Sequence, residues 1–441
     1  MAGRDRRVHI VGAGLAGLAC AVRLVRAGVP VTLHEAAAQA GGRCRSWRDE
    51  TLGRTIDNGN HLLLSGNGAA LAYLEAIGAA DELAGPATAA IPFLDLLTGT
   101  RWTLRPNAGG TPWWLFVPSR RAAGGGALAH LAGLRRLRRA AADATVAEAL
   151  HGNRLYRRLW EPLAVSILNT PAERGSARLL WRVFEETLGT GGAACRPLVA
   201  RRGLAPAFVD PALRLLLDGG GELCFHHRLT GLARTVDRVT GLRFAGSMRT
   251  VDRDDRVVLA LPAQAANTVL PEPVAPAAHH AILNVHFRLE RPAGLPGGAP
   301  LLGLVGGTAH WLFQRGDVVS ATISAADALA EWEPERIARL LWGDVALALR
   351  LPPGPPPDCR VVKERRATFA QTPRQAAARP GPRTAYSNLL LAGDWTDTGL
   401  PATIEGAVRS GNVAAAAVLE DFAGGDARSS GIRPAPVPHK G

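Results

Sequence analysis

The sequence has 441 residues, 47% of them hydrophobic, and its 51 Lys and Arg against 38 Asp and Glu give a formal net charge of +13. A chain of this length and composition supports two or three folded units, which excludes general disorder. Because arginine supplies nearly all of the positive charge and no recognition fold accompanies it, the charge does not indicate a nucleic-acid-binding protein.

The predicted elements open with a strand, a turn, a helix and a second strand over residues 8–35, the start of a doubly wound α/β domain. Further parts of such a domain follow much later: a short β segment over 219–232, a buried strand over 257–261, and a strand over 388–394 with a helix from about Thr403. Two long insertions separate these parts and contain most of the tryptophans. We therefore expect a nucleotide-binding domain interrupted by a second domain that receives the substrate.

The expected boundaries divide the chain into six segments. The nucleotide-binding domain is assigned residues 1–100, 216–275 and 386–423, the substrate domain residues 101–215 and 276–385, and a disordered Gly/Pro/Ser-rich tail residues 424–441. The expected fold class is α/β, a Rossmann-like nucleotide-binding domain with an inserted α+β substrate domain.

Three glycines follow the first strand in the pattern Gly12-x-Gly14-x-x-Gly17 and open the first helix. In this pattern the first glycine permits a tight turn, the second lets a pyrophosphate approach the backbone, and the third lets helix and strand pack closely. The next strand ends in Glu35, about where a carboxylate accepts hydrogen bonds from ribose hydroxyls. The motif predicts a dinucleotide site with the phosphates at the helix N-terminus.

Two further motifs favour FAD over NAD. Gly41-Gly42-Arg43 predicts a turn whose cation meets a second part of the pyrophosphate. Near the C-terminus a strand ends in Gly393-Asp394, where a carboxylate suits ribityl hydroxyls, and the following helix N-terminus favours negative charge at the N1/O2 edge of a flavin. The residues expected to contact FAD from these motifs are Gly12, Gly14, Leu15, Ala16, Gly17, Glu35, Gly42, Arg43, Gly393, Asp394, Ala402, Thr403 and Ile404.

These motifs and the segment 57–61 resemble the flavin amine oxidase and phytoene desaturase superfamily. Other segments are more specific, and through them the chain resembles the hydroxysqualene dehydroxylases of bacterial hopanoid synthesis from about residue 8 to residue 419. The segments that carry this second resemblance are 60–67, 113–116, 161–163, 168–171, 367–373 and 392–403.

The resemblance implies an FAD-binding domain of the amine-oxidase (GR2) type and the reductive removal of an allylic hydroxyl from hydroxysqualene, giving squalene and water. Reduced FAD is the implied hydride donor, and Gly59, Asn60, His61 and Leu229 are implied cofactor contacts. Such chemistry requires a proton donor, a dry apolar tunnel and shielding of an allylic cation, for which tryptophan faces are suited. Synthases that form hydroxysqualene are the implied upstream partners.

The identity of the proton donor stays open at the level of sequence. His61 lies in the segment that the superfamily places against the flavin, and imidazole titrates in the useful range. Asp57 opens the same segment, and Asp397 lies in a loop just beyond Asp394. Asn169 suits the orientation of a hydroxyl but has no acidic proton. Each of these residues also fits an ordinary structural role in a turn, a cap or a hydrogen-bonded core.

Peripheral contact with membrane lipid is expected, because a squalene-sized substrate resides in lipid. Five scattered cysteines fit a reducing compartment, and neither a signal peptide nor an uncharged apolar run of spanning length is present. We therefore expect a cytoplasmic protein at the inner face of the cytoplasmic membrane. The aromatic segment 112–117, followed by Arg120 and Arg121, and the basic amphipathic segment 134–139 are the expected docking surface; a core strand beside a solvated helix is the alternative.

Three rival functions stay open. A carotenoid-type polyene desaturase or isomerase shares the segment 57–67, and only the insertion motifs disfavour it. A flavin amine oxidase usually has aromatic residues after the C-terminal Gly-Asp pattern, and this chain has none between Thr396 and Gly411. A lipid carrier without flavin would have no need of Glu35, Arg43 and Asp394 together.

Overall fold

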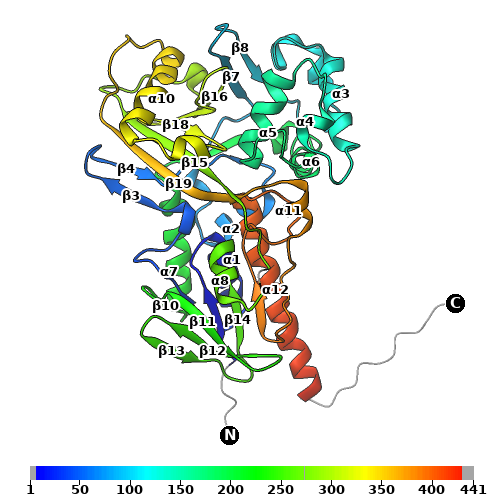
Figure 1. Ribbon diagram of the computed structural model, residues 1–441, viewed down its shortest axis with the longest axis vertical. Coiled ribbons are helices and arrows are strands. Elements are labelled where there is room, and N and C mark those ends of the chain that lie inside the picture. The colour runs from blue at the N-terminus through cyan, green and yellow to red at the C-terminus, as the bar shows by residue number, and fades with distance from the viewer. Residues whose placement is uncertain (1–5, 273, 430–441) are drawn as a thin grey trace, which may run out of the picture.

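The computed structural model describes residues 6–272 and 274–429. Figure 1 shows two lobes, one built on a parallel sheet near the N-terminus and the other on a larger mixed sheet. The long C-terminal helix runs along the first lobe and ends on the side away from the second. Within the described residues, no helix combines the length and the apolar character that are needed to cross a membrane.

The first lobe is a nucleotide-binding domain of the doubly wound type. Its sheet has five parallel strands in the order β10-β2-β1-β14-β20. Their bounds are β1 Val8–Val11, β2 Val31–His34, β10 Glu222–Cys224, β14 Arg256–Leu259 and β20 Leu389–Leu391. The helices associated with it are α1 Leu15–Arg26, α2 Gly68–Ala76, α7 Asp210–Asp218 and α12 Ile404–Ser429.

Both faces of this sheet are covered, which explains why most of its strand residues are apolar. Ile10 and Val258 face the core that the helices cover, whereas Val11 and Leu259 face a second core. The second core is closed by helix α8 (Ala263–Val269) and by an antiparallel meander of β11 Leu229–Arg234, β12 Val239–Phe244 and β13 Ser247–Thr250.

The second lobe is built on a mixed seven-stranded sheet in the order β19-β15-β18-β17-β16-β7-β8. The strands are β7 Ile91–Asp95, β8 Arg101–Leu104, β15 His279–Arg288, β16 Leu301–Val305, β17 Trp311–Arg315, β18 Val318–Ile323 and β19 Cys359–Phe369. Helix α10 (Pro334–Leu349) packs on one face with α9 (Asp327–Ala330). A helical cluster packs at the β7–β8 end and comprises α3 Ala127–Arg138, α4 Val146–Ala149, α5 Glu161–Leu168 and α6 Ala177–Glu186.

A small hairpin of β3 (Ser46–Asp49) and β4 (Arg54–Asp57) connects the lobes. Its three ion pairs with the seven-stranded sheet are Asp49 with Arg360, Arg54 with Asp317 and Asp57 with Arg315. The remaining short elements are β5 Leu63–Leu64, β6 Leu83–Ala84 and β9 Pro197–Ala200, which form a small sheet, and helix α11 Pro373–Ala377.

Three expected boundaries are wrong. Strand β7 lies before residue 101, yet it pairs with β16 in the seven-stranded sheet. Residues 197–215 were expected in the substrate domain, yet Leu198, Leu204 and Phe208 lie in the helix-side core of the first lobe. Short apolar runs carry no local signal for such distant partners, since the periodicity of a segment does not name the strand or helix that it contacts.

The third error concerns the C-terminal segment. Helix α12 continues to Ser429 rather than ending at residue 423, because an established helix gains a hydrogen bond with each added residue and a glycine costs only about 1 kcal/mol. Residues 430–441 of the expected tail lie outside the described residues.

Candidate active site

The glycine-rich turn between β1 and α1 has the shape that a pyrophosphate requires. A Cβ atom on Gly12 would overlap the carbonyl oxygen of Ala260, and one on Gly17 would overlap the carbonyl oxygen of Gly12. A Cβ on Gly14, in contrast, would meet no atom within 4 Å. No side chain caps α1, so the amides that begin at Leu15 are left to an anion at the helix N-terminus. The residues present therefore fit a dinucleotide phosphate.

Glu35 is held at the edge of the same turn. Its two carboxylate oxygens accept hydrogen bonds from the backbone N–H groups of Ala13 and Ala37, each at 2.9 Å. Each carboxylate oxygen can accept a further hydrogen bond, so Glu35 is held in place and can still accept from ribose hydroxyls. Leu229, the first residue of β11, is buried in the meander-side core that also contains Val11.

Arg43 and Asp394 join distant parts of the chain beside this turn. The backbone N–H of Gly41 donates to the carbonyl of Ala13, which places the turn 41–43 against the glycine-rich turn. Gly41 and Gly42 both have positive φ, which glycine adopts without strain. The Arg43 guanidinium forms an ion pair of 2.8 Å with the Asp394 carboxylate. Burial alone would lower the pKa of Arg43, but Asp394 offsets this effect and the pKa is raised.

The start of α12 is the second helix N-terminus at the site. Thr403 caps the helix, because its hydroxyl accepts from the backbone N–H of Gly406 at 3.1 Å. The N–H of Ala402 already donates to the side chain of Gln371 at 2.8 Å and that of Gly406 to Thr403, so the amides of Ile404 and Glu405 are left for a ligand. Among the expected contacts, Ala402 therefore has no free backbone donor.

Arg379, which the sequence did not single out, holds the loop between Asp394 and α12. Its side chain is 2% exposed and donates to the carbonyls of Thr396 and Leu400 at 3.3 and 2.7 Å and to the Asp397 carboxylate at 3.1 Å. Burial lowers the pKa of Arg379, although Asp397 and Asp394 oppose this. The residue is thus a fixed cation behind the expected flavin loop.

Asp57 is an ion-paired carboxylate whose oxygens accept hydrogen bonds from within the protein. It accepts hydrogen bonds from the Ser46 hydroxyl at 2.5 Å and the Leu204 N–H at 2.9 Å, and it pairs with Arg315 at 2.6 Å. These partners come from three separate parts of the chain. The structure therefore favours a positioning role for Asp57: its contacts hold the end of strand β4, from which the chain continues to His61.

His61 lies two residues beyond Gly59, which packs so close to Asn284 that a Cβ would stand 3.1 Å from its amide nitrogen. Asn60 donates to the side chains of Thr322 and Asn284 at 3.0 and 3.3 Å. His61 itself has no hydrogen-bond partner within the part of the chain that the structure describes. Burial lowers its pKa to about 4, although the Asp57 carboxylate opposes this. The imidazole is thus neutral at pH 7 and available to a ligand.

A cavity of about 40 Å³ lies beside this segment, lined by Asp57, Asn60 and His61 and by residues of β17 and β18. His286, another lining residue, contacts the Asp57 carbonyl through Nε2 at 3.1 Å and the Ser320 hydroxyl through Nδ1 at 2.7 Å. Because the carbonyl only accepts, Nε2 carries the proton and Nδ1 accepts from Ser320. Burial lowers the pKa of His286 to about 4, so the cavity contains two neutral imidazoles.

The other two catalytic candidates do not line this cavity. Asn169, at φ 45°, donates to Thr368 at 3.0 Å and to the His280 carbonyl at 3.2 Å, and it accepts from the Ala325 N–H at 2.6 Å, so its amide is fully engaged in holding chain segments together. The Asp397 side chain is 57% exposed and pairs with Arg379. The geometry brings Asp57 and His61 together and leaves Asn169 and Asp397 outside.

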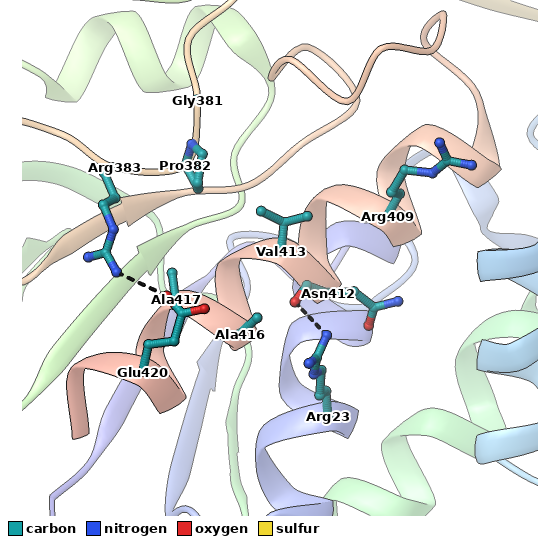
Figure 2. Close-up of a pocket in the computed structure, with 10 residues that line it drawn as sticks. All are labelled: Arg23, Gly381, Pro382, Arg383, Arg409, Asn412, Val413, Ala416, Ala417 and Glu420. Carbon is teal, nitrogen blue, oxygen red and sulfur yellow. Dashed lines mark hydrogen bonds and ion pairs between the residues drawn. The ribbon is translucent and has the colours of Figure 1, made fainter. Parts of the chain in front are cut away.

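A second, open cavity of about 480 Å³ lies on the surface between α1, α12 and the segment 381–383 (Figure 2). It contains none of the expected site residues. Its arginines are engaged within the protein: Arg23 with the Asn412 carbonyl, Arg383 with Glu420 and Asp421, and Arg409 with Glu186 and Glu405. We therefore assign the site to the 57–61 cavity.

Besides Arg379, sequence reasoning missed His286 and Arg315, which had only a weak signal. In the strand 279–288, Asn284 and His286 alternate with apolar Leu283, Val285 and Phe287, which predicts one polar face. What that face contacts depends on the β4 strand end, more than 200 residues earlier in the chain.

Comparisons with known proteins identify the family of the chain. The family model described as flavin containing amine oxidoreductase matches residues 15–419. Two proteins named hydroxysqualene dehydroxylase, from Rhodopseudomonas palustris and Sinorhizobium fredii, are 46% and 45% identical over 417 residues, which cover 94% of this chain and 99% of each relative.

Among solved structures, cyclohexylamine oxidase from Brevibacterium oxydans is similar in fold, with a TM-score of 0.69, 18% identity and coverage of 95% of this chain and 100% of that one. A zeta-carotene desaturase from Synechocystis is 44% identical, but over only 77 residues, or 18% of this chain and 16% of the relative. The similarity to the dehydroxylases thus extends over nearly the whole chain, whereas that to the desaturase is local.

Proposed function

The chain belongs to the hydroxysqualene dehydroxylases within the flavin containing amine oxidoreductases, and from this premise we propose that it converts hydroxysqualene to squalene with FAD as its flavin. The similarity to the dehydroxylases over nearly the full length of the chain is the main support for this reaction. Glu35 and Asp394 are far apart in sequence, and both lie beside the glycine-rich turn. Two separate carboxylates there suit the two ends of an extended dinucleotide, which supports FAD.

The reaction breaks the allylic C–O bond, forms a C–H bond at the same allylic system and releases water. The bound flavin, in its reduced form, supplies the two electrons and the hydrogen as hydride. The protein must protonate the departing hydroxyl and exclude water from the allylic cation. A class of enzyme that forms hydroxysqualene must act before it.

We assign the proton transfer to His61. It lines the 57–61 cavity and has no hydrogen-bond partner within the described residues, whereas Asp57 is ion-paired and His286 has both ring nitrogens engaged. A substrate hydroxyl in this cavity would receive its proton from the imidazolium form of His61. Because the resting imidazole is neutral, it must first take up that proton from solvent. Arg43 and Asp394 would hold the cofactor beside this cavity, and the first-turn amides of α12 would favour negative charge on it.

A product assay tests the reaction and the main rival together. The purified protein, reduced without oxygen, is mixed with hydroxysqualene in detergent, and squalene is quantified by mass spectrometry. The proposal predicts squalene only with reduced protein. Absence of squalene, together with dehydrogenation of a phytoene-type polyene by the oxidised protein, would instead establish the desaturase alternative.

Because the proposed substrate resides in lipid, we also propose that the protein binds the membrane surface peripherally, through the helical cluster and the aromatic segment before it. Of the expected aromatic segment, Trp114 and Leu115 are buried in the core, so only Trp113 and Phe116 stay available, at 49% and 64% exposure. Leu128 on α3 is 78% exposed. Exposed arginines on the same helix are Arg135, Arg136 and Arg138. Apolar insertion beside cations suits an anionic lipid surface.

Vesicle sedimentation tests this surface. The proposal predicts binding to vesicles with anionic lipid, weaker binding to zwitterionic vesicles, and a loss of at least tenfold in the double variant Trp113→Ala/Phe116→Ala. Met248→Ala, at an exposed apolar residue on β13 of the other lobe, is the matched control and is expected to bind like the parent. Equal binding by all variants would refute this docking surface.

A further inference from the structure

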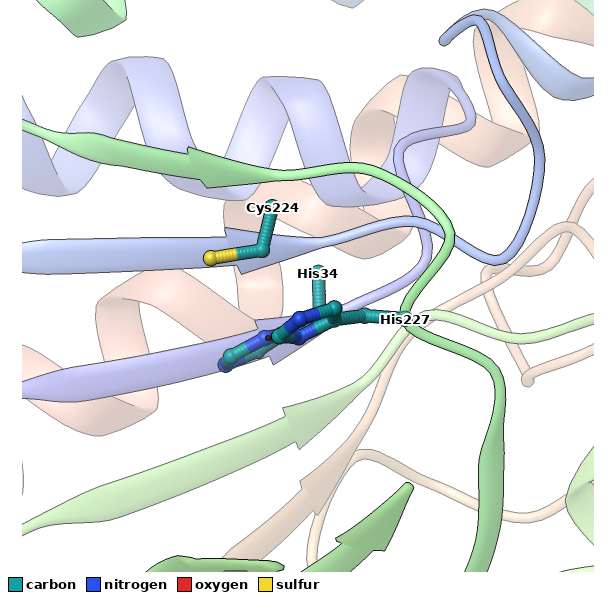
Figure 3. Close-up of side chains that lie close together, drawn as sticks. All are labelled: His34, Cys224 and His227. Atoms are coloured by element: carbon teal, nitrogen blue, oxygen red, sulfur yellow. Dashed lines mark hydrogen bonds between the residues drawn. The ribbon is translucent and has the colours of Figure 1, made fainter. Parts of the chain in front are cut away.

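Three side chains of types that commonly bind metals lie together in the first lobe, at and just beyond the carboxyl ends of β2 and β10. The ligand atoms of His34, Cys224 and His227 all lie within 4.8 Å of one another, and Figure 3 shows the three side chains on one side of the strands. His34 is buried, while Cys224 and His227 are half-buried. None of these residues belongs to the site proposed for the reaction.

The sheet register brings two of these side chains together. Strands β2 and β10 are parallel neighbours in which Cys224 is aligned with His34, so both side chains project from the same face at the carboxyl ends of their strands. The chain then turns back, and the backbone N–H of His227 donates to the carbonyl of Glu35 at 2.8 Å. Backbone hydrogen bonds therefore position all three ligands before any metal binds.

A second observation indicates a ligand rather than a chance cluster. His34 contacts the Nδ1 atom of His9 through Nε2 at 3.4 Å, and the Nε2 atom of His9 lies 3.7 Å from the Asp255 carboxylate. With the proton of His9 on Nε2, the nitrogen that faces this carboxylate, His9 Nδ1 would accept from His34 Nε2–H, which leaves the lone pair of His34 on Nδ1. Metal-binding histidines are commonly held in this way by a partner on the other ring nitrogen.

The spacing of the two imidazoles also matches a metal site. Their Nδ1 atoms are 3.3 Å apart, with the ring planes within 8° of each other. Two nitrogens at about 2.0–2.1 Å from a tetrahedral Zn²⁺ are separated by about 3.3 Å. In the metal-free protein a single N–H···N hydrogen bond occupies this space, and a metal would replace that proton once both rings turn their lone pairs away from each other and toward the cation.

We propose that His34, Cys224 and His227 form a binding site for a zinc-like divalent cation, with a solvent molecule as fourth ligand. Two imidazoles and a thiolate bind Zn²⁺ in preference to Mg²⁺ or Ca²⁺, which favour oxygen ligands. The half-exposed Cys224 and His227 leave a path from solvent. The bound cation would tie the turn between β10 and β11 to the end of β2, next to Glu35, and would stiffen the region expected to hold the adenosine part of the cofactor.

Metal titration of the flavin-loaded protein, purified without a polyhistidine tag and stripped with a chelator, tests the site. We expect one Zn²⁺ per chain by elemental analysis after desalting, with release of protons on binding. Co²⁺ is expected to give tetrahedral d–d bands at wavelengths longer than those the flavin absorbs. Cys224→Ser and His227→Ala are each expected to weaken binding at least tenfold and to abolish the stabilisation that the metal gives in thermal unfolding.

The matched controls are Cys359→Ser, a half-buried cysteine in the other lobe, and His226→Asn, the exposed neighbour of His227. Asparagine tolerates the positive φ of residue 226. Both controls are expected to bind like the parent. Failure of the parent protein to retain stoichiometric metal, or unchanged affinity in Cys224→Ser and His227→Ala, would overturn the proposal. Because the titration needs no substrate, its outcome is independent of the proposed reaction.

Discussion

Two neutral histidines and one ion-paired carboxylate line the cavity proposed as the site. Asp57, one of the acids considered from sequence, accepts hydrogen bonds from Ser46 and Leu204 and is ion-paired with Arg315. His61 has no such partner among the described residues, and burial keeps it uncharged at neutral pH. The sequence predicts a role for His61 and Asp57 from their segment alone, but the contacts that distinguish the two residues depend on Arg315, which lies 258 positions after Asp57.

Replacing His61 by Ala tests its role directly. We expect the rate of squalene formation by the pre-reduced protein to fall about 10²- to 10⁴-fold, the usual contribution of a general acid. Because His61 is also an implied cofactor contact, the rate is compared per bound flavin. The parallel variant Asp397→Asn should keep the parental rate, because that carboxylate lies outside the cavity. A parental rate in His61→Ala would remove this histidine as the acid.

Arg379 is expected to be a positioning residue. In Arg379→Gln the carbonyls of Thr396 and Leu400 lose a buried donor, so we expect the protein to be destabilised by about 1.5–3 kcal/mol and to bind FAD more weakly. The exposed Arg374→Gln on α11 serves as the control. Calorimetric FAD titration and urea unfolding measure the two effects. If both variants behaved alike, the loop would not depend on Arg379.

At the scale of elements, the sequence predicted the parts whose signals are local. The glycine spacing placed the turn before α1, and apolar runs placed β1, β2 and β14. The position of β7 was predicted wrongly because its partner β16 lies about 200 residues away. The small hairpin of β3 and β4 likewise gave no sign that its ion pairs would connect it to the seven-stranded sheet.

The glycine-rich turn allows a test that separates folding from cofactor binding. A Cβ on Gly14 meets no protein atom within 4 Å, so Gly14→Ala should fold like the parent when FAD is absent. The added methyl group would occupy the space of the pyrophosphate, and we expect FAD affinity to fall at least tenfold. Gly231→Ala on β11 also meets open space and is the control. Parental affinity in Gly14→Ala would place the phosphates elsewhere.

At the scale of the whole molecule, several buried and half-buried histidines couple stability to pH. Burial lowers the pKa values of His61, His286 and His310 to about 4, below the ordinary value of 6.5 that the unfolded chain retains. Between these values the unfolded chain binds more protons, so the free energy of unfolding falls as the pH falls through this window.

We therefore expect stability to decrease between pH 6.5 and pH 5, by about 1.4 kcal/mol per pH unit for each histidine that stays neutral when folded. Urea unfolding monitored by tryptophan fluorescence at pH 7.5, 6.5, 5.5 and 5.0 measures this slope. Replacing His310 by Gln should reduce it. A stability that is constant or rises on acidification through this range would contradict the burial of these neutral histidines.

The central claim is that the chain removes the hydroxyl of hydroxysqualene by transferring hydride from its own flavin. The most direct measurement is an anaerobic single turnover, in which photoreduced protein is mixed with hydroxysqualene while flavin reoxidation and squalene are followed together. The account predicts one squalene for each flavin reoxidised, at the same rate. Flavin that stays reduced in the presence of bound hydroxysqualene, with no squalene formed, would contradict it.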